Sequence, residues 1–276
     1  GIETINVRSV GSGNVALDAS QAPGVTAVNS DRGTGVFAAT NLASGASYGI
    51  IGNGVVTLGT QGVGYAAAAT ASTINVSGGT VSTGTVTVSG TGLKDATVNS
   101  TGAANTIGAL TLAASQNGTL TINATTDLTT GAITNTTAAA LTKLTVTGAG
   151  AVNTSSTALQ STVVTVDASA NTGGVTLVTG DNATAGTAAA PSITVTTGSG
   201  NDSVDLRAHS AGDYTKVNVG AGNNTVIVTR AQLDNATAVN ELTAGSGTDT
   251  LKIDYANDVA GSTTVDLSAK ITGFET

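Results

Sequence analysis

The sequence predicts an all-β protein folded as a β-solenoid, similar to a parallel β-helix or β-roll and rich in Thr, Gly and Ala. Three observations predict it: short segments of alternating apolar and polar residues, Gly- and Asx-rich turns between them, and few aromatic residues, only 2% of 276. Alternation with a period of two is the pattern of a strand with one buried and one exposed face. The abundant Thr and Val are β-branched and favour strands over helices.

The alternating segments recur along the whole chain, and turn-forming Gly, Asn, Ser and Asp separate each from the next. They comprise residues 4–8, 73–76, 85–88, 120–123, 144–147, 164–167, 193–196 and 216–219. Residues 231–242 have the apolar spacing of a short helix or turn. Many short strands at regular spacing indicate a sandwich, a barrel or a solenoid.

A solenoid is preferred because its thin coils need only small aliphatic side chains inside, whereas a sandwich core of this size normally uses more aromatic residues. Thr and Asn at equivalent positions of successive coils can also stack as ladders. One or two β-sandwich domains remain the alternative, although the chain lacks the Cys and Trp of an immunoglobulin core.

Composition excludes several classes of function. Without Cys, the chain cannot form zinc–thiolate, iron–sulfur or disulfide sites or use a Cys nucleophile. Its single histidine, His209, leaves little room for acid–base or metal–imidazole catalysis. A net charge of −8 disfavours nucleic acid and anionic membranes as partners, and no apolar run is long enough to cross a bilayer. We therefore expect a protein that is not an enzyme and is not inserted in a membrane.

Three segments in the last third share the pattern G-x-G-x-[D/N]-x-U-x-U, where U is aliphatic. They begin at Gly198, Gly220 and Gly245, so their starts are 22 and 25 residues apart. The pattern matches most of the calcium-binding nonapeptide G-G-x-G-x-D-x-U-x. In that motif the two Gly permit a tight loop, and the Asp supplies the hard, anionic oxygen that calcium prefers.

The predicted cofactor is therefore calcium. The predicted metal-site residues are Gly198, Gly200, Asp202, Gly220, Gly222, Asn224, Gly245, Gly247 and Asp249. Ten of the 17 acidic residues follow residue 200, as such sites would require.

The repeats also depart from the motif. Thr197, Val219 and Ala244 replace its first Gly, and the copies are not back to back, so a strict 18-residue β-roll is not supported. The alternative is a set of Gly-Asx turns that join strands without a metal.

These loops, with the Thr-, Ala- and Gly-rich strands around them, resemble bacterial surface-layer (S-layer) proteins of the RTX, type I secreted class. Residues 1–7 (GIETINV) and 271–276 (ITGFET) match phrases that recur in those proteins and in RTX adhesins. The resemblance implies an exported, calcium-stabilised solenoid at the bacterial cell surface. It carries the calcium-binding Asp positions over to Asp202 and Asp249, and to Asn224 as a weaker neutral donor. The phrase shared by both ends suggests one unit of a longer array.

The predicted function is therefore that of a structural extracellular subunit that associates with itself into a surface lattice, with cell-surface polysaccharide as a further partner through a region not present. The alternatives are a stalk or repeat segment of a secreted RTX-type adhesin and an extracellular filament or matrix protein. Two regions are expected, a Thr/Ala/Gly-rich β-region over 1–190 and a calcium-binding region over 191–276. Asp205, Arg207, His209 and Asp213 follow the first loop, and we interpret them as an exposed loop between coils instead of a catalytic cluster.

Overall fold

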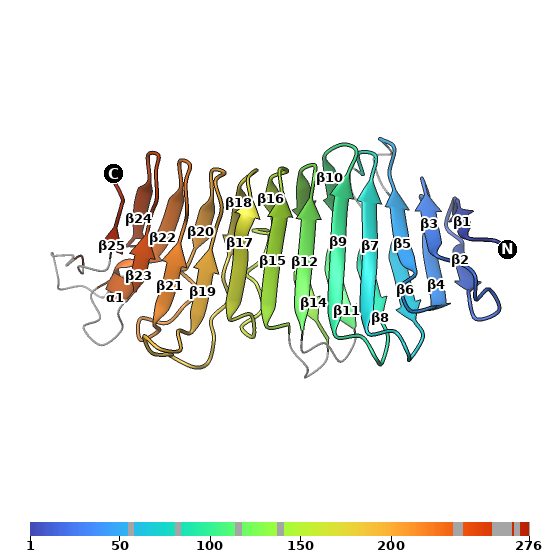
Figure 1. Cartoon of the computed structure of the whole chain (residues 1–276), viewed down its shortest axis with the longest axis horizontal. Helices are drawn as coiled ribbons and strands as arrows, with labels where there is room; N and C mark the ends of the chain where they lie inside the picture. The colour runs from blue at the N-terminus through green and yellow to red at the C-terminus, as the bar shows by residue number, and fades with distance from the viewer. Residues whose placement is uncertain are drawn as a thin grey trace. The chain divides into compact units, whose positions relative to one another are not determined.

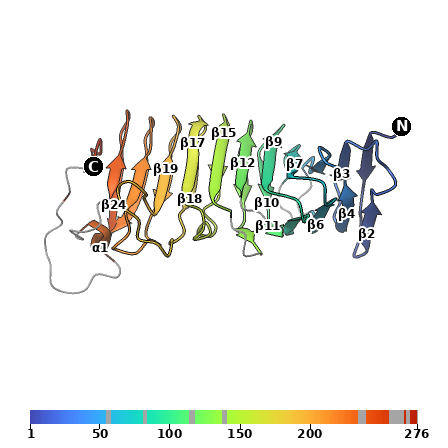
Figure 2. The same cartoon turned by 60° about the horizontal axis from the view of Figure 1, so that its bottom comes forward.

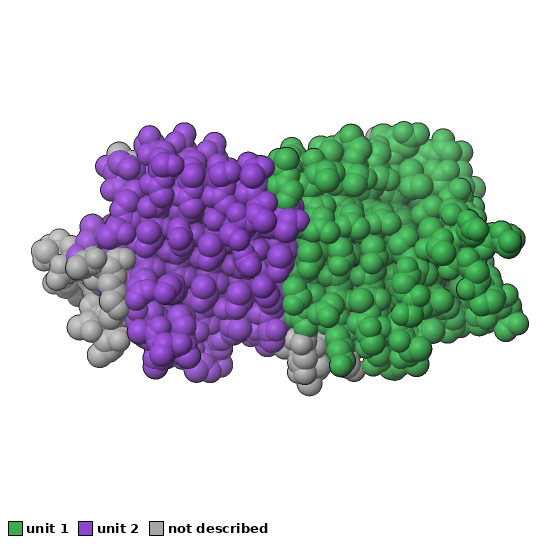
Figure 3. Space-filling model, in the orientation of Figure 1, with its two compact units in different colours: residues 1–141, 148–150 green, residues 142–147, 151–276 purple. Residues whose placement is uncertain are grey.

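Parallel strands, hydrogen-bonded from one coil to the next, make up almost all of the regular structure (Figure 1). The computed structural model describes residues 1–54, 58–80, 84–113, 118–136, 141–233, 240–255, 267 and 271–275. The fold is an all-β parallel β-solenoid of about 10 turns. The chain divides into two compact units (Figure 3): unit 1 is residues 1–141 with 148–150, and unit 2 is residues 142–147 with 151–276.

Unit 1 contains strands of three parallel sheets. The first holds β1 (Thr4–Val7), β3 (Ala27–Asp31), β5 (Ser47–Ile51), β7 (Ala71–Ser77), β9 (Asp95–Thr101) and β12 (Thr119–Ala124). The second holds β2 (Asn14–Asp18), β4 (Val36–Leu42), β6 (Gln61–Tyr65), β8 (Val86–Ser89), β11 (Leu110–Ala113) and β14 (Ile133–Asn135). The third holds β10 (Asn105–Ile107) and β13 (Leu128–Thr130). Within the unit, colour changes steadily from strand to strand in Figures 1 and 2, so coils stack in sequence order.

The core of unit 1 is a set of apolar columns that run through successive coils. Val28, Tyr48, Ile74, Val98 and Ile122 are register partners from β3 to β12, and each is at most 1% exposed. Each aliphatic side chain removed from water in this way contributes about 1.5–3 kcal/mol. The column explains the period-two pattern of the sequence, because every second residue of a strand must fill the same small space in each coil.

The few aromatic residues of unit 1 pack inside the coils. The rings of Phe37 and Tyr48 stack with their centroids 5.9 Å apart, and the Tyr48 hydroxyl donates to Oε1 of Gln61 at 2.7 Å. Burial raises the pKa of Tyr48 and also that of Tyr65, whose hydroxyl donates to the Thr73 carbonyl at 3.1 Å. These rings therefore serve the core, and none of them forms an exposed contact surface.

Polar residues of unit 1 also stack, as the sequence predicts. The side-chain amide of Asn123 donates to Oδ1 of Asn99 at 2.9 Å, and that of Asn99 donates to Oδ1 of Asn75 at 2.7 Å. Asn29 donates to Asn6 in the same way at 2.8 Å. Each amide both donates and accepts, so identical residues in adjacent coils satisfy one another.

Unit 2 contains strands of the first and third sheets. Its first-sheet strands are β15 (Lys143–Gly148), β17 (Thr165–Asn171), β19 (Ile193–Thr196), β21 (Thr215–Asn218), β23 (Glu241–Thr243) and β25 (Ile271–Thr272). Its third-sheet strands are β16 (Val152–Asn153), β18 (Val175–Val178), β20 (Ser203–Asp205), β22 (Thr225–Thr229) and β24 (Thr250–Asp254). One helical turn, α1 (Arg230–Leu233), follows β22.

The coil length of unit 2 equals the spacing of the Gly-Asx segments. Thr194 of β19 is in register with Lys216 of β21, and Lys216 with Glu241 of β23, which are steps of 22 and 25 residues. The three segments therefore occupy the same corner of three consecutive coils. There each one joins a first-sheet strand to a third-sheet strand.

The sequence-based expectations of the fold are largely confirmed. All eight alternating segments lie in strands or overlap them. The sandwich alternative is wrong, because the strand pairings described are parallel, apart from one isolated antiparallel bridge between Gly186 and Pro191. The helix expected over 231–242 is reduced to α1, since Leu242 belongs to β23 and residues 234–239 lie outside the described residues. No helix among the described residues is long and apolar enough to span a membrane.

The glycines of the Gly-Asx segments allow the stacked loops to approach closely. A Cβ atom on Gly198 would lie 1.8 Å from the carbonyl oxygen of Asn171, one on Gly220 would lie 2.0 Å from that of Gly198, and one on Gly245 would lie 2.1 Å from that of Gly220. Gly200, Gly222 and Gly247 form a second column with the same constraint. The pattern G-x-G therefore marks two positions at which the backbones of neighbouring coils leave no room for a side chain.

We predict that Gly245→Ala destabilises the protein by about 1–3 kcal/mol, because the added methyl group must displace backbone of the preceding coil. Gly212→Ala is the matched control, since Gly212 lies in an exposed turn with no atom within 4 Å of its Cβ position. It should change stability by no more than about 0.5 kcal/mol. Urea unfolding followed by circular dichroism measures both. Equal stability of the two variants would contradict the close approach of the loops.

Candidate cation sites in unit 2

The Asx residues of the three segments form a buried hydrogen-bond ladder. The backbone N–H of Asp202 donates to Oδ1 of Asn224 at 2.8 Å, and the backbone N–H of Asn224 donates to Oδ1 of Asp249 at 2.9 Å. Each acceptor lies one coil further along the chain than its donor. The ladder continues from Asp249 N–H to Oε2 of Glu275 at 2.7 Å. Asp202, Asn224 and Asp249 are at most 3% exposed. The segments therefore bring their predicted ligands together, and each ligand already accepts a hydrogen bond from the protein.

A second, exposed ladder runs beside the first. The N–H of Asn223 donates to Oδ1 of Asn201 at 2.8 Å, and the N–H of Thr248 donates to Oδ1 of Asn223 at 2.9 Å. These residues immediately precede the buried Asx residues. In the second and third loops, two adjacent backbone N–H groups thus donate to side chains of neighbouring coils, one to the coil before and one to the coil after.

The three buried Asx residues differ in the hydrogen-bond partner of the second polar atom of the side chain. Oδ2 of Asp202 accepts from the Thr197 hydroxyl at 2.6 Å, and its Oδ1 accepts from the N–H of Val175 at 2.7 Å. The amide nitrogen of Asn224 donates to Oδ1 of Asp249 at 2.8 Å. Oδ2 of Asp249, by contrast, is buried and has no hydrogen-bond partner among the described residues.

The residues that replace the first Gly of the nonapeptide account for this difference. Thr197 provides a hydroxyl beside Asp202, whereas Ala244, at the equivalent position before Asp249, has none to provide. Burial raises the pKa of Asp202 above its ordinary value, and the hydrogen bonds from Thr197 and from the Val175 N–H oppose that rise. A buried carboxylate with an unsatisfied oxygen is costly, so Asp249 is the position in the ladder best suited to a cation.

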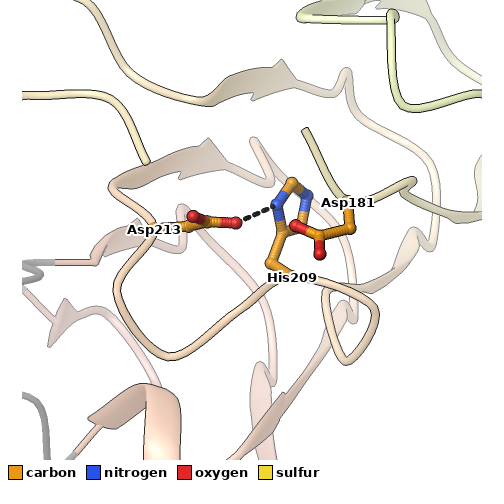
Figure 4. A group of neighbouring side chains, drawn as sticks. All are labelled: Asp181, His209 and Asp213. Atoms are coloured by element: carbon orange, nitrogen blue, oxygen red, sulfur yellow. Dashed lines mark hydrogen bonds and ion pairs between the residues drawn. The ribbon is translucent and has the colours of Figure 1, made fainter. Parts of the chain in front are cut away.

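A second group of potential ligands lies beside the ladder coils (Figure 4). Asp181 lies in the loop after β18, His209 in the turn after β20, and Asp213 just before β21. One potential ligand atom from each residue lies within 4.8 Å of the others, so the three could hold a metal ion. Figure 4 shows the imidazole ring between the two carboxylates, with Nδ1 of His209 at 3.2 Å from Oδ2 of Asp213.

Burial sets the electrostatics of this group. The side chain of His209 is 0% exposed and that of Asp213 is 4% exposed. Desolvation raises the pKa of Asp213, its neighbour Asp181 raises it further, and the hydrogen bond with His209 opposes both. Nε2 of His209 is buried without a hydrogen-bond partner among the described residues. The group therefore combines two close carboxylates with an imidazole nitrogen that lacks a partner.

The expectation of an exposed loop is wrong for Asp205, which is buried at the end of β20, and for His209 and Asp213, which are also buried. The turn is held inside by the side-chain amide of Gln232, which donates to the carbonyls of Leu206 and His209 at 2.8 and 2.7 Å. Arg207 does reach solvent, and it pairs with Asp205 at 2.7 Å. The spacing of His209 and Asp213 was visible in the sequence, but the approach of Asp181 was not, because it depends on how the long loop after β18 folds.

No family model, curated protein or solved structure matches the chain. The β-solenoid that the surface-layer resemblance implies is present, and the function that the resemblance implies stays a prediction. So does calcium at the Gly-Asx loops.

We predict that Thr197→Val destabilises the protein by about 1–3 kcal/mol, because Val keeps the shape of Thr but leaves Oδ2 of Asp202 buried without a donor. The control is Ser199→Ala, which removes an exposed hydroxyl from the same loop and should cost no more than about 0.5 kcal/mol. Urea unfolding gives both values. If the Val variant were as stable as the Ala variant, the Thr197 hydrogen bond would have no net effect.

We also predict that Asp202 makes the protein less stable as the pH rises above about 4. A carboxyl group whose pKa is raised on folding binds its proton more tightly in the folded state, so its ionisation costs stability. That cost is absent below the ordinary pKa of 3.8 and is complete above the folded pKa. Asp202→Asn should flatten the pH dependence in this window, while the ladder persists because Asn occupies the same place in the next coil. Unfolding free energies measured from about pH 3 to pH 7 test this, and identical profiles for the two proteins would contradict it.

Proposed function

We propose that this chain is a structural subunit of a bacterial surface layer, exported from the cell, stabilised by calcium and assembled by self-association. The observation that carries the proposal is that polar side chains of the protein form hydrogen bonds between neighbouring coils. Asn75, Asn99 and Asn123 in unit 1, and the Asx residues of the three segments in unit 2, bind the neighbouring coil. Such residues build a regular scaffold, and they are not free to act on a substrate.

The Asp181–His209–Asp213 group also fits a structural role better than a catalytic one. The His209 side chain is 0% exposed, so a substrate in solvent cannot reach the imidazole. General acid–base catalysis requires a group within hydrogen-bond reach of the reacting atom. We therefore propose that the protein is not an enzyme.

Calcium is proposed to bind at the end of the buried ladder, at Asp249 and Glu275. Oδ2 of Asp249 lacks a partner among the described residues, and the carboxylate of Glu275 lies one coil further on, bound to the Asp249 N–H. Calcium prefers several hard oxygen ligands, including carboxylates and backbone carbonyls. Asp202 is a weaker candidate, because both of its oxygens already accept hydrogen bonds from the protein.

Self-association is supported by apolar side chains that are exposed in unit 1. Ile2 and Val10 are 68% and 64% exposed, and Val15 and Val36 are more than one third exposed. Val15 of β2 and Val36 of β4 lie on paired strands, and exposed apolar side chains that lie together on a surface mark contacts with another chain, as a lattice requires.

The test is a calcium titration of the full chain, followed by circular dichroism and light scattering, with chelator reversal and a magnesium control. We expect calcium to raise stability and then to increase particle size, while magnesium does neither. Particles that stay monomeric in calcium would overturn the surface-layer proposal and favour an adhesin stalk.

Two Asn variants test the position of the ion. Asp249→Asn should abolish the calcium response, because it removes a ligand while keeping the ladder hydrogen bonds. Asp202→Asn is the matched control and should retain the response. If both variants respond to calcium as the unmodified protein does, calcium binds elsewhere.

A further inference from the structure

We propose that Asp181, His209 and Asp213 form a binding site for a first-row transition metal ion of the zinc class. This site is distinct from the calcium site at the Gly-Asx ladder. It goes beyond the proposed surface-layer function and does not depend on it.

The donor set selects the class of metal. Imidazole nitrogen suits zinc, copper, nickel and iron, whereas calcium and magnesium are bound almost entirely by oxygen. One imidazole with two carboxylates is a mixed nitrogen–oxygen set, and three protein ligands leave a fourth position for water, as in open zinc sites.

The geometry is close to that of a zinc site. With metal–ligand distances of about 2.0–2.2 Å in a tetrahedron, neighbouring ligand atoms lie roughly 3.3 Å apart. Nδ1 of His209 and Oδ2 of Asp213 are already 3.2 Å apart. The ligand atoms lie up to 4.8 Å apart, so one carboxylate must move by up to roughly 1.5 Å to complete the site. Asp181 is exposed and lies in a loop, where such a movement meets little resistance.

Among the described residues, the His209 side chain has a hydrogen-bond partner at only one of its two ring nitrogens. A buried imidazole normally satisfies both ring nitrogens, because an unmet buried polar atom costs about 1–3 kcal/mol. Here Nδ1 faces Asp213, and Nε2 has no partner among the described residues. Nδ1 therefore makes a single contact, with Oδ2 of Asp213, and a metal ion bound between these two atoms would replace that contact.

The surroundings hold the ligands in place and favour a cation. The Ser210 N–H donates to Oδ2 of Asp213 at 3.1 Å, and the Ser210 hydroxyl donates to Oδ2 of Asp181 at 3.2 Å. Ser210 thus links the two carboxylates, and Gln232 anchors the backbone of His209. Two carboxylates held this close repel one another, and a divalent cation between them removes that cost.

The single histidine of the chain makes the test direct. The full chain, labelled with ¹⁵N-histidine, is titrated with Zn²⁺ and followed by NMR, and Co²⁺ binding is followed by its visible absorption. We expect one equivalent of Zn²⁺ to shift the only imidazole signals and to raise the melting temperature, and Ca²⁺ to leave those signals in place. Imidazole signals unchanged by Zn²⁺ would overturn the proposal.

Variants of single residues distinguish loss of Zn²⁺ binding from loss of the folded structure. Asp181→Asn changes an exposed residue, so the metal-free protein should keep its stability while Zn²⁺ affinity falls roughly tenfold or more. His209→Gln should abolish binding, although its burial means that it can also weaken the fold. Asp249→Asn is the control, and it should bind Zn²⁺ normally even where calcium-dependent assembly is lost. Unchanged Zn²⁺ affinity in Asp181→Asn would overturn the site.

Discussion

The fold depends on one constraint: each coil must be hydrogen-bonded in register to the coil before it and the coil after it. Parallel strands bring equivalent residues to about 4.8 Å from one another. Each residue must therefore be compatible with its register partners in the preceding and the following coil. In unit 1 this produces the column from Val28 to Ile122, in which each side chain fills the space above the last. The column is aliphatic except at Tyr48, whose ring stacks on that of Phe37.

The same constraint explains why the Gly-Asx segments resemble a calcium motif and yet have internal hydrogen bonds. The two glycines of each copy lie where backbones of adjacent coils touch, as Gly220 does against the carbonyl of Gly198. The Asx residue lies where a buried N–H of the preceding coil needs an acceptor, as Asn224 does for Asp202. Close stacking and acceptor oxygens are also what a calcium loop requires, so one sequence pattern serves both.

The sequence was sufficient to predict the strands, the solenoid and the stacking of the repeats, because these follow from period-two alternation and from spacings of 22 and 25 residues. It was insufficient for the Asp181–His209–Asp213 group. The register step from Thr165 to Thr194 is longer than those that follow, because the loop after β18 is inserted within that coil. Side chains brought together by a loop of irregular length have no periodic signal, and the burial of His209 depends on Gln232, a residue one coil away.

The hydrogen bonds of Asn224 give a physical reason why the middle repeat has Asn where the calcium motif has Asp. If Asn224 were Asp, three consecutive buried carboxylates would stack at about 4.8 Å without compensating charge. As an amide, Asn224 accepts from the Asp202 N–H and donates to Oδ1 of Asp249, so it separates the two acids and binds both neighbours. The neutral Asn224 therefore keeps Asp202 and Asp249 from being adjacent in the ladder.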